Sequence, residues 1–235
     1  MYSIKHTFFC TTIEQGFLSE EESNHAVRVL RLKANDFITI IDGKGKSVKA
    51  QITVSDKKRL HFNIEETLFE ESPKTKVHIA IAPTKNMDRF QFFIEKATEI
   101  GIDEITPILT KNSERKVINI EKVRKSCISA LKQSGNLYLP KINDLQKIED
   151  FTSTQDAKHQ IFIAHCETDQ DKTELKDLLD DSNFVTILIG PEGDFSSEEI
   201  KLAKKNGWIP TSLGSTRLRT ETAGIVACHT VRLIS

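Results

Sequence analysis

Two glycine-containing segments near the C-terminal end constrain the fold of this chain most. They read Ile187-Leu-Ile-Gly-Pro-Glu-Gly-Asp-Phe-Ser-Ser-Glu-Glu199 and Leu213-Gly-Ser-Thr-Arg-Leu-Arg-Thr-Glu-Thr-Ala223, and each joins an apolar run to a predicted helix. In open α/β sheets, ligands bind where loops follow the carboxyl ends of parallel strands. The two segments therefore predict an α/β fold with a small-molecule site formed largely by main chain.

The first third of the chain has the pattern of a separate β domain. Alternating apolar and polar residues predict three short strands, over 36–41, 47–53 and 60–64. A helix is expected over 20–30, with Ser19 and Glu22 as a capping box. Glu70-Glu-Ser-Pro73 interrupts regular structure, so we predict a small β-barrel domain over residues 1–72.

After this boundary, predicted strands alternate with predicted helices. The strands are expected over 77–82, 104–108, 160–165, 185–189 and 209–213. The helices are expected over 87–100, 119–131, 197–206 and 220–234. Strands that alternate with helices form a mostly parallel sheet covered on both faces. We therefore predict that residues 73–235 form one α/β domain.

The net charge of −1 is close to neutral, but the charges are unevenly distributed. Residues 74–147 carry 14 basic and 8 acidic side chains, whereas residues 148–235 carry 9 and 15. The basic segment fits a phosphate-binding face, and it also fits a solvated lysine-rich surface. Within it and on the first predicted helix we select five candidate phosphate contacts, Arg28, Arg31, Lys111, Arg115 and Lys116.

Composition and motifs argue against several other classes. Four scattered cysteines without a C-x-x-C pair predict neither a disulfide framework nor a metal site. No apolar run approaches the ~20 residues of a membrane span, and no signal segment is recognisable, so a soluble, cytoplasmic protein is expected. Gly45-Lys46-Ser47 lacks the first glycine of a P-loop, and no G-x-G-x-x-G follows a predicted strand.

Gly190-Pro-Glu-Gly193 and Arg217-Leu-Arg219 are the candidate site residues that the pattern itself selects. Glycine permits close approach and unusual φ angles, so main-chain amides and carbonyls can face a ligand. A tight strand-to-helix turn without a ligand would have the same local sequence. The loop at Leu213-Gly214 favours a site, because two such loops can hold one ligand and the arginines can then stabilise negative charge.

These motifs resemble those of the ribosomal RNA small subunit methyltransferase E family. The resemblance rests on Ile189-Gly-Pro-Glu-Gly193 and on Leu213-Gly-(x)3-Leu-Arg-Thr-Glu-Thr-Ala223. It extends to Glu95-Lys-Ala-Thr-Glu-Ile-Gly101 with Ile105-Thr-Pro107, to Gln133-Ser-Gly135 with Leu139-Pro140, and to His25-x-x-Arg-Val-Leu-Arg31 with Asp42-Gly43. It therefore spans both predicted domains.

The resemblance implies a PUA-like β-barrel that binds RNA, followed by a SPOUT methyltransferase domain whose C-terminal chain forms a trefoil knot. The implied cofactor is S-adenosyl-L-methionine, held by the knot loops. The implied reaction is methylation of N3 of one uridine in small-subunit ribosomal RNA, within the 30S subunit, by a homodimer. Two alternatives stay open: a SPOUT methyltransferase that acts on transfer RNA, and a non-catalytic RNA-binding ribosome assembly factor.

Carried over residue by residue, the resemblance implies a set of cofactor-binding positions. They are Ile189, Gly190, Glu192, Gly193, Leu213, Gly214, Leu218, Arg219, Thr222 and Ala223. Positions that differ from the family pattern include Asp194, which replaces a glycine, and Asn136 and Thr7, which stand where arginine is frequent. The change at Asp194 is expected to alter the loop only modestly, whereas the other two concern RNA contacts.

Methyl transfer from a sulfonium requires alignment and a competent nucleophile. Uracil N3 carries a proton at neutral pH, so a base, or a group that stabilises a negative oxygen, must favour the deprotonated ring. Arg219 or Arg217 is the candidate stabiliser, and Glu221 is the candidate base, although a carboxylate at a helix N-terminus is more often structural. N3 lies on the pairing edge, so the uridine must be unpaired or flipped out.

Overall fold

The computed structural model of the chain describes residues 6–154, 159–167 and 172–234. Contacts between residues divide it into two compact units. The first unit extends to Ser72 and includes Ile128–Leu139, and the second comprises Pro73–Cys127 and the chain from Pro140 onward. The predicted domains placed all of 73–235 together, whereas the structure packs 128–139 with the first unit.

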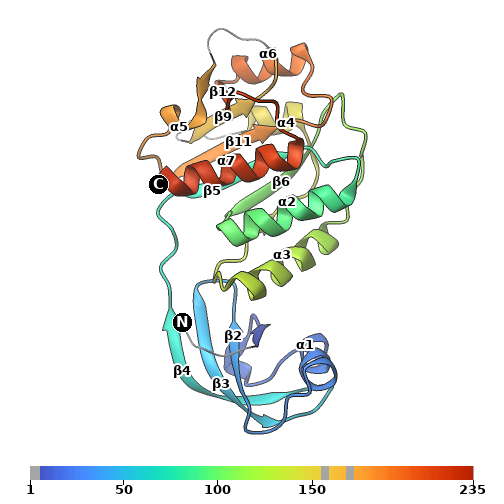
Figure 1. The fold of residues 1–235 in the computed structure, drawn as a ribbon, viewed down its shortest axis with the longest axis vertical. Helices are drawn as coiled ribbons and strands as arrows, with labels where there is room; N and C mark the ends of the chain where they lie inside the picture. Colours follow the sequence, from blue (N-terminus) through green and yellow to red (C-terminus); the bar gives the residue numbers. More distant parts are fainter. Residues whose placement is uncertain (1–5, 155–158, 168–171, 235) are drawn as a thin grey trace. The chain divides into compact units, whose positions relative to one another are not determined.

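The first unit is built on a curved sheet with the strand order β1-β2-β3-β4 (Figure 1). β1 pairs parallel with β2, and the other neighbouring strands are antiparallel. Its elements are β1 (Thr7–Phe9), η1 (Ile13–Gln15), α1 (Glu20–Asn24), η2 (His25–Val29), β2 (Phe37–Ile41), β3 (Lys46–Val54) and β4 (His61–Phe69). The three predicted strands are confirmed, and β1 is a further strand that the pattern did not indicate.

The helix predicted over 20–30 is confirmed, but its second half is a π-helical turn, η2. The Ser19 side chain accepts a hydrogen bond from the Glu22 amide at 3.3 Å, as expected. The other half of the predicted capping box is wrong, because the Glu22 carboxylate pairs with Lys132 at 2.7 Å instead. The helix ends before Arg31, whose backbone is left-handed with φ 57°.

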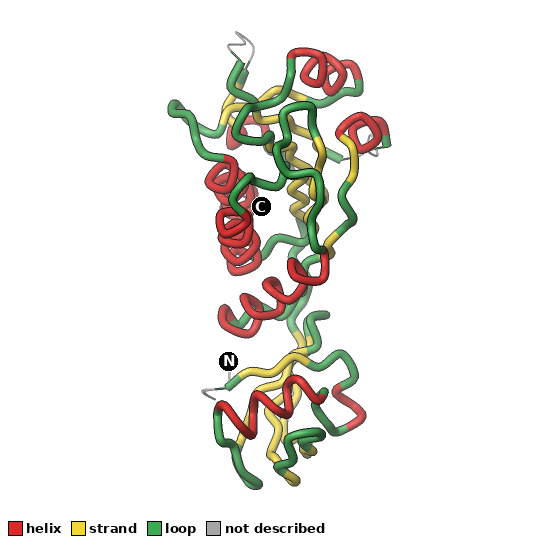
Figure 2. The backbone as a smooth tube through the Cα atoms, turned by 90° about the vertical axis from the view of Figure 1, so that its right-hand side faces the viewer, coloured by secondary structure: helices red, strands yellow, loops and turns green. Residues whose placement is uncertain are grey.

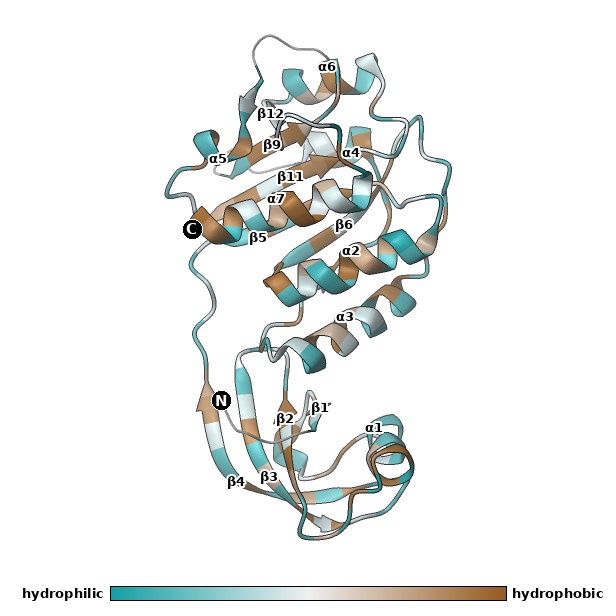
Figure 3. Cartoon of the chain, viewed as in Figure 1, coloured by the Kyte–Doolittle hydropathy of each residue, from teal (hydrophilic) through white to brown (hydrophobic). Residues whose placement is uncertain are grey.

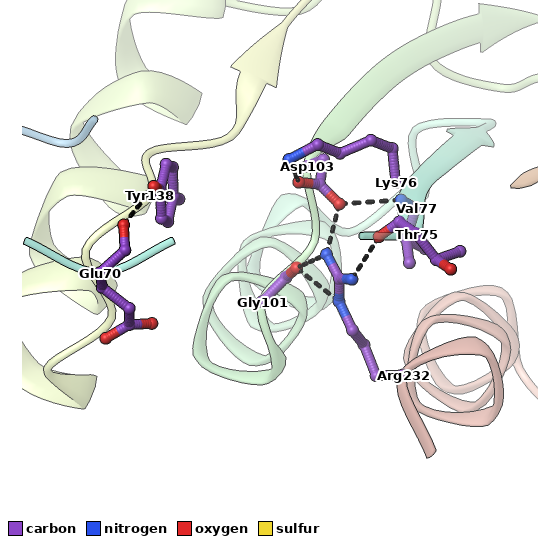
Figure 4. Close-up of polar contacts among 8 residues, drawn as sticks. All are labelled: Glu70, Thr75, Lys76, Val77, Gly101, Asp103, Tyr138 and Arg232. Carbon is purple, nitrogen blue, oxygen red and sulfur yellow. Dashed lines mark hydrogen bonds and ion pairs between the residues drawn. The ribbon is translucent and has the colours of Figure 1, made fainter. Parts of the chain in front are cut away.

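The C-terminal half of α3 (Ile120–Ser134) and the segment after it complete the first unit. Leu131 is fully buried in a cluster with Ile41, at the end of β2. Tyr138, which follows the helix, donates a hydrogen bond to the carbonyl of Glu70 at 2.6 Å (Figure 4). Apolar burial and a hydrogen bond to the main chain therefore hold residues 128–139 in the first unit. The sequence analysis had predicted them in the second domain.

The second unit contains a parallel sheet with the strand order β10-β12-β9-β11-β5-β6-β7, and β8 also pairs with β6. All of these pairings are parallel. The strands are β5 (Lys76–Ile81), β6 (Glu104–Leu109), β7 (Lys141–Ile142), β8 (Gln146–Lys147), β9 (Gln160–Ala164), β10 (Thr173–Glu174), β11 (Phe184–Ile189) and β12 (Ile209–Ser212). The predicted strands correspond to β5, β6, β9, β11 and β12 and are confirmed.

Helices cover both faces of this sheet (Figures 1 and 2). On one face, α7 packs against α2, α5, β5 and β11, and on the other α4 packs against α6. These helices are α2 (Met87–Ile100), α4 (Ile148–Ser153), α5 (Leu175–Leu178), α6 (Ser197–Lys205) and α7 (Thr220–Ile234). The predicted helices correspond to α2, α3, α6 and α7 and are confirmed, and no helix in the described ranges is long and apolar enough to cross a bilayer.

The central strands are apolar at nearly every position, because both of their faces are buried (Figure 3). In β5, Ala80 joins a buried cluster with Phe151 and Trp208 on one side of the sheet. Ile81 points to the opposite side, where it lies under Gly224 of α7. A continuous apolar core thus fixes the sheet and leaves the strand ends free to carry polar loops.

Two predicted helix boundaries of the second unit are confirmed in atomic detail. Gly101 ends α2 with a left-handed φ of 101° and donates its amide to the Ala97 carbonyl. Ser196 and Glu199 form a complete capping box at the start of α6, with distances of 3.3 Å and 2.7 Å. The second oxygen of Glu199 accepts the Lys111 amide at 2.7 Å, so this cap also holds the loop after β6.

Candidate functional site

The loops that follow the strands of the second unit gather at one edge of the sheet, because these strands are parallel. Two adjoining cavities of about 260 Å³ and 280 Å³ lie at this carboxyl edge. Both are lined by Ala164, Cys166, Arg217, Leu218 and Ala223. Three segments therefore enclose one site: the end of β9, the loop after β11, and the loop between β12 and α7.

The loop after β12 crosses the loop after β11 and is tied to it. In Figure 1, the dark red segment leaves β12 and runs across the sheet to the start of α7. The Thr220 hydroxyl donates to the Gly190 carbonyl at 3.0 Å, and Arg217 donates to the Glu192 carbonyl at 3.2 Å. The two loops that the sequence predicts to hold one ligand are therefore in direct contact.

Loops from three other strands also hold the 190–194 loop in place. The Glu192 carboxylate accepts the Lys85 amide, from the loop after β5, at 3.0 Å. Asn112, from the loop after β6, donates to the Asp194 carbonyl at 3.0 Å. The Asp194 carboxylate accepts the Cys166 amide, from the segment after β9, at 2.7 Å. The site is thus rigidly assembled from loops that are far apart in sequence.

Glycine is required at two positions of the crossing loops. A Cβ on Gly190 would lie 3.1 Å from the ring of Phe195, which is tighter than most side-chain contacts. Gly214 has a φ of 128°, a conformation that residues with side chains rarely adopt. Close approach of the main chain, which the sequence indicates through its glycines, is therefore present in the structure.

Two protein-family models match the chain. Residues 70–232 match the RNA methyltransferase domain, and residues 18–65 match the RNA methyltransferase PUA domain. The first match covers well over half of the sequence.

The chain belongs to this RNA methyltransferase family.

Relatives of this RNA methyltransferase agree with the match. A Rickettsia conorii protein named ribosomal RNA small subunit methyltransferase E is 32% identical over 92% of this chain and 88% of its own length. The crystal structure of a probable rRNA-methyltransferase from Porphyromonas gingivalis has 36% identity and a TM-score of 0.91, with 98% of each chain covered. That of a ribosomal RNA small subunit methyltransferase E from Neisseria gonorrhoeae, bound to S-adenosyl methionine, has 26% identity and a TM-score of 0.86, with 97% of each covered.

The family resemblance inferred from the motifs is therefore confirmed, and so is the fold class. The methyltransferase has a PUA-like N-terminal part followed by a SPOUT-type, knotted α/β domain with helices on both faces of a parallel sheet. The crossing of the two C-terminal loops belongs to that fold.

Most of the predicted cofactor-binding residues of this RNA methyltransferase line the two cavities. They are Ile189, Gly190, Glu192, Leu213, Gly214, Leu218, Arg219 and Ala223. Gly193 and Thr222 lie in the same segments but not in the lining. Gly193 acts through packing instead, since a Cβ there would lie 3.3 Å from the Asn112 side chain.

The two predicted arginines lie at the cavities and differ in their contacts. Arg217 lines both cavities, and one of its guanidinium nitrogens donates a hydrogen bond to the Glu192 carbonyl. Arg219 lines one cavity, and among the described residues no carboxylate pairs with it. Its exposed guanidinium therefore remains available to negative charge that develops in the site.

Glu221, the candidate base, lies in the first turn of α7 but does not line either cavity. Its side chain is only 8% exposed, and its Oε1 lies 3.9 Å from Nε of Arg89 in the first turn of α2. Arg89 was not selected from the sequence, because its partner is 132 positions away. This geometry is typical of an ion pair that holds the two helix starts together.

The end of β9 contributes residues that the sequence analysis missed. Ala164, His165, Cys166 and Lys172 line the cavity of about 260 Å³, and the Lys172 ammonium donates to the His165 carbonyl at 2.8 Å. β9 itself was predicted, but no glycine motif follows it. These residues reach the site because β9 lies between β11 and β12, so only knowledge of the strand order would have pointed to them. In the described ranges, no group of three or more acidic, histidine or cysteine side chains could hold a metal ion.

The five predicted RNA contacts divide between the two units. In the first unit, Arg28 and Arg31 are exposed at the end of the helix. Arg28 lines an open surface hollow with Lys57 and Lys58, and also with Glu20, Glu21 and Asn24. The sequence analysis did not select these two lysines. Their loop follows β3, so only the tertiary structure brings it to the helix.

The other three predicted contacts lie in the loop after β6 of the second unit. Arg115 donates to the carbonyls of Thr84 and Lys85, at 3.3 Å and 2.9 Å, and so orders the loop after β5. Lys111 forms an exposed ion pair with Glu198. Lys116 is exposed, and its ammonium forms no ion pair with any residue that the structure describes.

Proposed function

We propose that this protein uses S-adenosyl-L-methionine to methylate N3 of one uridine in small-subunit ribosomal RNA. The observation that carries the proposal is the cavity formed where the 213–219 loop crosses the 190–194 loop. Two facts about relatives support it: the Rickettsia protein is named a ribosomal RNA small subunit methyltransferase, and the Neisseria enzyme was crystallised with S-adenosyl methionine.

The residues of the cavities fit this cofactor. Ile189 and Leu218 offer apolar surface to a planar ring, and the main chain of Gly190 and Gly214 can approach it closely. When bound, S-adenosyl-L-methionine would supply a methyl group attached to a positive sulfur.

Arg219 is the residue that we assign to the charge that develops on the base. As N3 loses its proton, negative charge spreads to the ring carbonyl oxygens, and a guanidinium at the cavity can donate to them. Arg217 lies beside it and also holds the Glu192 carbonyl. The role of Glu221 as base stays a prediction, and its burial against Arg89 favours a structural role.

RNA binding is assigned to exposed cations in each unit. In the first unit these are Arg28 and Arg31, and in the second unit Lys116 is the best placed of the predicted contacts. Phosphate contacts of this kind give affinity without reading sequence. The target uridine must then be presented with its pairing edge free.

The proposal includes a cytoplasmic location, a homodimeric enzyme and a substrate within the 30S subunit. Exposed apolar side chains on the packed helices α2 and α7 support a dimer: Phe92 is 49% exposed, Leu233 74% and Ile234 48%. Sedimentation equilibrium at micromolar concentration should give twice the mass of the chain. A mass equal to one chain would contradict the dimer and leave the chemistry untouched.

Titration calorimetry with S-adenosyl-L-methionine tests the cofactor directly. We expect binding with one site per chain, together with a rise in the thermal unfolding midpoint. Absence of both would favour a non-catalytic assembly factor.

Mapping of methylated uridines in cells that lack the gene tests the target. We expect one small-subunit ribosomal RNA uridine to lose its N3 methyl group and to regain it with the wild-type gene. The Arg219→Ala gene should fail to restore it. Normal ribosomal RNA beside an undermethylated transfer RNA would refute the proposed substrate.

A further inference from the structure

We infer that Asp194 is a positioning residue that holds the segment after β9 against the loop after β11 and so sets the width of the cofactor cavity. This inference rests on the proposed function for the identity of the ligand. It does not depend on which RNA is methylated. The residue touches neither of the arginines assigned to charge, so its role is distinct from theirs.

The backbone of Asp194 indicates that its side chain is needed. Its φ is 61°, in the left-handed region that only glycine adopts freely. Aspartate is among the few residues with a side chain that tolerate this region, because its carboxylate can bond to nearby main chain. The strain of a non-glycine residue here must therefore be offset by contacts of the carboxylate.

Those contacts extend the strand pairing beyond the end of the sheet. β9 and β11 are paired up to Ala164 and Ile189, and the segments that follow the two strands then separate. Asp194 Oδ2 accepts the Cys166 amide at 2.7 Å, two residues past the last pair. Its Oδ1 accepts the Phe195 amide at 2.8 Å, which fixes the orientation of the carboxylate.

The same carboxylate borders the cavity that it shapes. Cys166 and Asp194 line one cavity together, and Cys166 also lines the other. The Asp194 carbonyl is held from behind by Asn112 at 3.0 Å, so the loop cannot follow if the segment after β9 moves away. Loss of the carboxylate would therefore let one wall of the cavity move while the other stays.

The neighbouring thiol provides a readout that needs no cofactor. Cys166 is exposed, whereas Cys10, Cys127 and Cys228 are buried. Burial and then the negative charge of Asp194 raise the pKa of the Cys166 thiol. Removal of that charge should lower the thiol pKa and speed its reaction with a disulfide reagent.

Three variants test the inference by calorimetry with S-adenosyl-L-methionine and by thermal unfolding. Asp194→Gly should weaken binding about tenfold, the size of a lost hydrogen bond to a charged group, while its unfolding midpoint stays or rises because glycine relieves the backbone. Asp194→Asn, which suits the left-handed backbone and keeps one acceptor, should bind within about threefold of the wild type. Asp180→Asn is the matched control, since Asp180 caps the Ser182 amide at 2.8 Å in a loop outside the cavity, and it should change nothing.

The thiol measurement separates failure of this inference from failure of the proposed function. Asp194→Gly should shift the pH profile of Cys166 labelling to lower pH, and Cys166→Ser should abolish the signal. Wild-type affinity in Asp194→Gly would overturn the inference, whatever its labelling profile. So would a loss of affinity that merely parallels a loss of stability. A wild-type protein that binds no S-adenosyl-L-methionine would contradict the proposed function, and the labelling profile would still show whether the Asp194 carboxylate lies beside Cys166.

Discussion

The two edges of the parallel sheet in the second unit use polar groups in opposite ways. At the carboxyl edge, main-chain groups of the crossing loops and the guanidinium of Arg219 face a cavity. At the amino edge, polar side chains bind one another and close the sheet. Arg232 of α7 donates to the carbonyls of Gly101 and Thr75 and pairs with Asp103 (Figure 4).

The amino edge is therefore a satisfied network. Asp103 also accepts the Val77 amide at 2.8 Å and pairs with Lys76 at 3.0 Å, so its largely buried carboxylate has several donors. Beside it, His78 bonds to Thr106 at 2.7 Å. Buried polar groups stabilise a fold only when they are paired, whereas a binding site needs some left available. The difference predicts that the amino edge governs stability and the carboxyl edge governs chemistry.

Among these predictions, removal of Arg232 should have the largest effect on stability. Arg232→Met leaves the Asp103 carboxylate without its main partner, and breaking one side of a largely buried pair costs about 3–5 kcal/mol of unfolding free energy. Urea unfolding measures this loss. Arg232→Lys keeps the charge but loses the planar donors, so its unfolding free energy should lie between those of the wild type and Arg232→Met. The proposed difference between the two edges would be wrong if Arg232→Met left stability unchanged and abolished methylation in the folded enzyme.

Arg219→Ala should show the opposite division. We expect kcat for methylation to fall by about 100- to 1,000-fold, because a donor to the developing negative oxygen is lost. The urea midpoint should stay at the wild-type value, since Arg219 is exposed and unpaired among the described residues. Single-turnover methylation of ribosomal RNA with saturating cofactor measures the effect. A fall in stability equal to that of Arg232→Met would erase the distinction between the two edges.

Acid should act on the amino edge through His78. Burial, partly opposed by Glu104, lowers the pKa of His78 from 6.5 to about 4, with Lys141 and His159 acting in the same direction as burial. Between pH 6.5 and 4 the unfolded chain binds a proton at His78 and the folded chain does not. The contribution of neutral His78 to the unfolding free energy is therefore present above pH 6.5 and is lost as pH falls toward 4. The loss is of the order of 2–3 kcal/mol. His78→Gln should flatten the dependence of the urea midpoint on pH over that range, and an unchanged slope would assign the titration to another group.

The smallest effect is expected from Lys111 at the carboxyl edge. Its ammonium pairs with Glu198 at 3.4 Å, and both side chains are largely exposed, so the pair contributes little to stability. Lys111→Ala should leave the unfolding midpoint unchanged and weaken RNA binding by a small factor, more at low salt than at high salt. A filter-binding series at several salt concentrations checks this. A stability loss comparable to that of Arg232→Met would show that the exposed edge also carries structural charge.

Local pattern was sufficient for most of the elements and for the two loops. The strand periods, the cap at Ser196 and Glu199, and the glycines at 190 and 214 are encoded over a few residues, so their spacing alone predicts them. The family motifs lie in those same stretches. For this reason the fold class and most of the cavity lining could be predicted without coordinates.

Tertiary structure decided which distant residues share a site. The segment at Cys166 borders the cavity because β9 lies between β11 and β12, an order that no local signal encodes. Arg115 bonds to carbonyls and Glu221 pairs with Arg89, although both look like available charges in the sequence. The left-handed backbone of Asp194 likewise depends on where the neighbouring loop lies. Short-range spacing determines elements and turns, whereas the pairing of charges depends on which elements become neighbours, and that is settled by packing of the whole core.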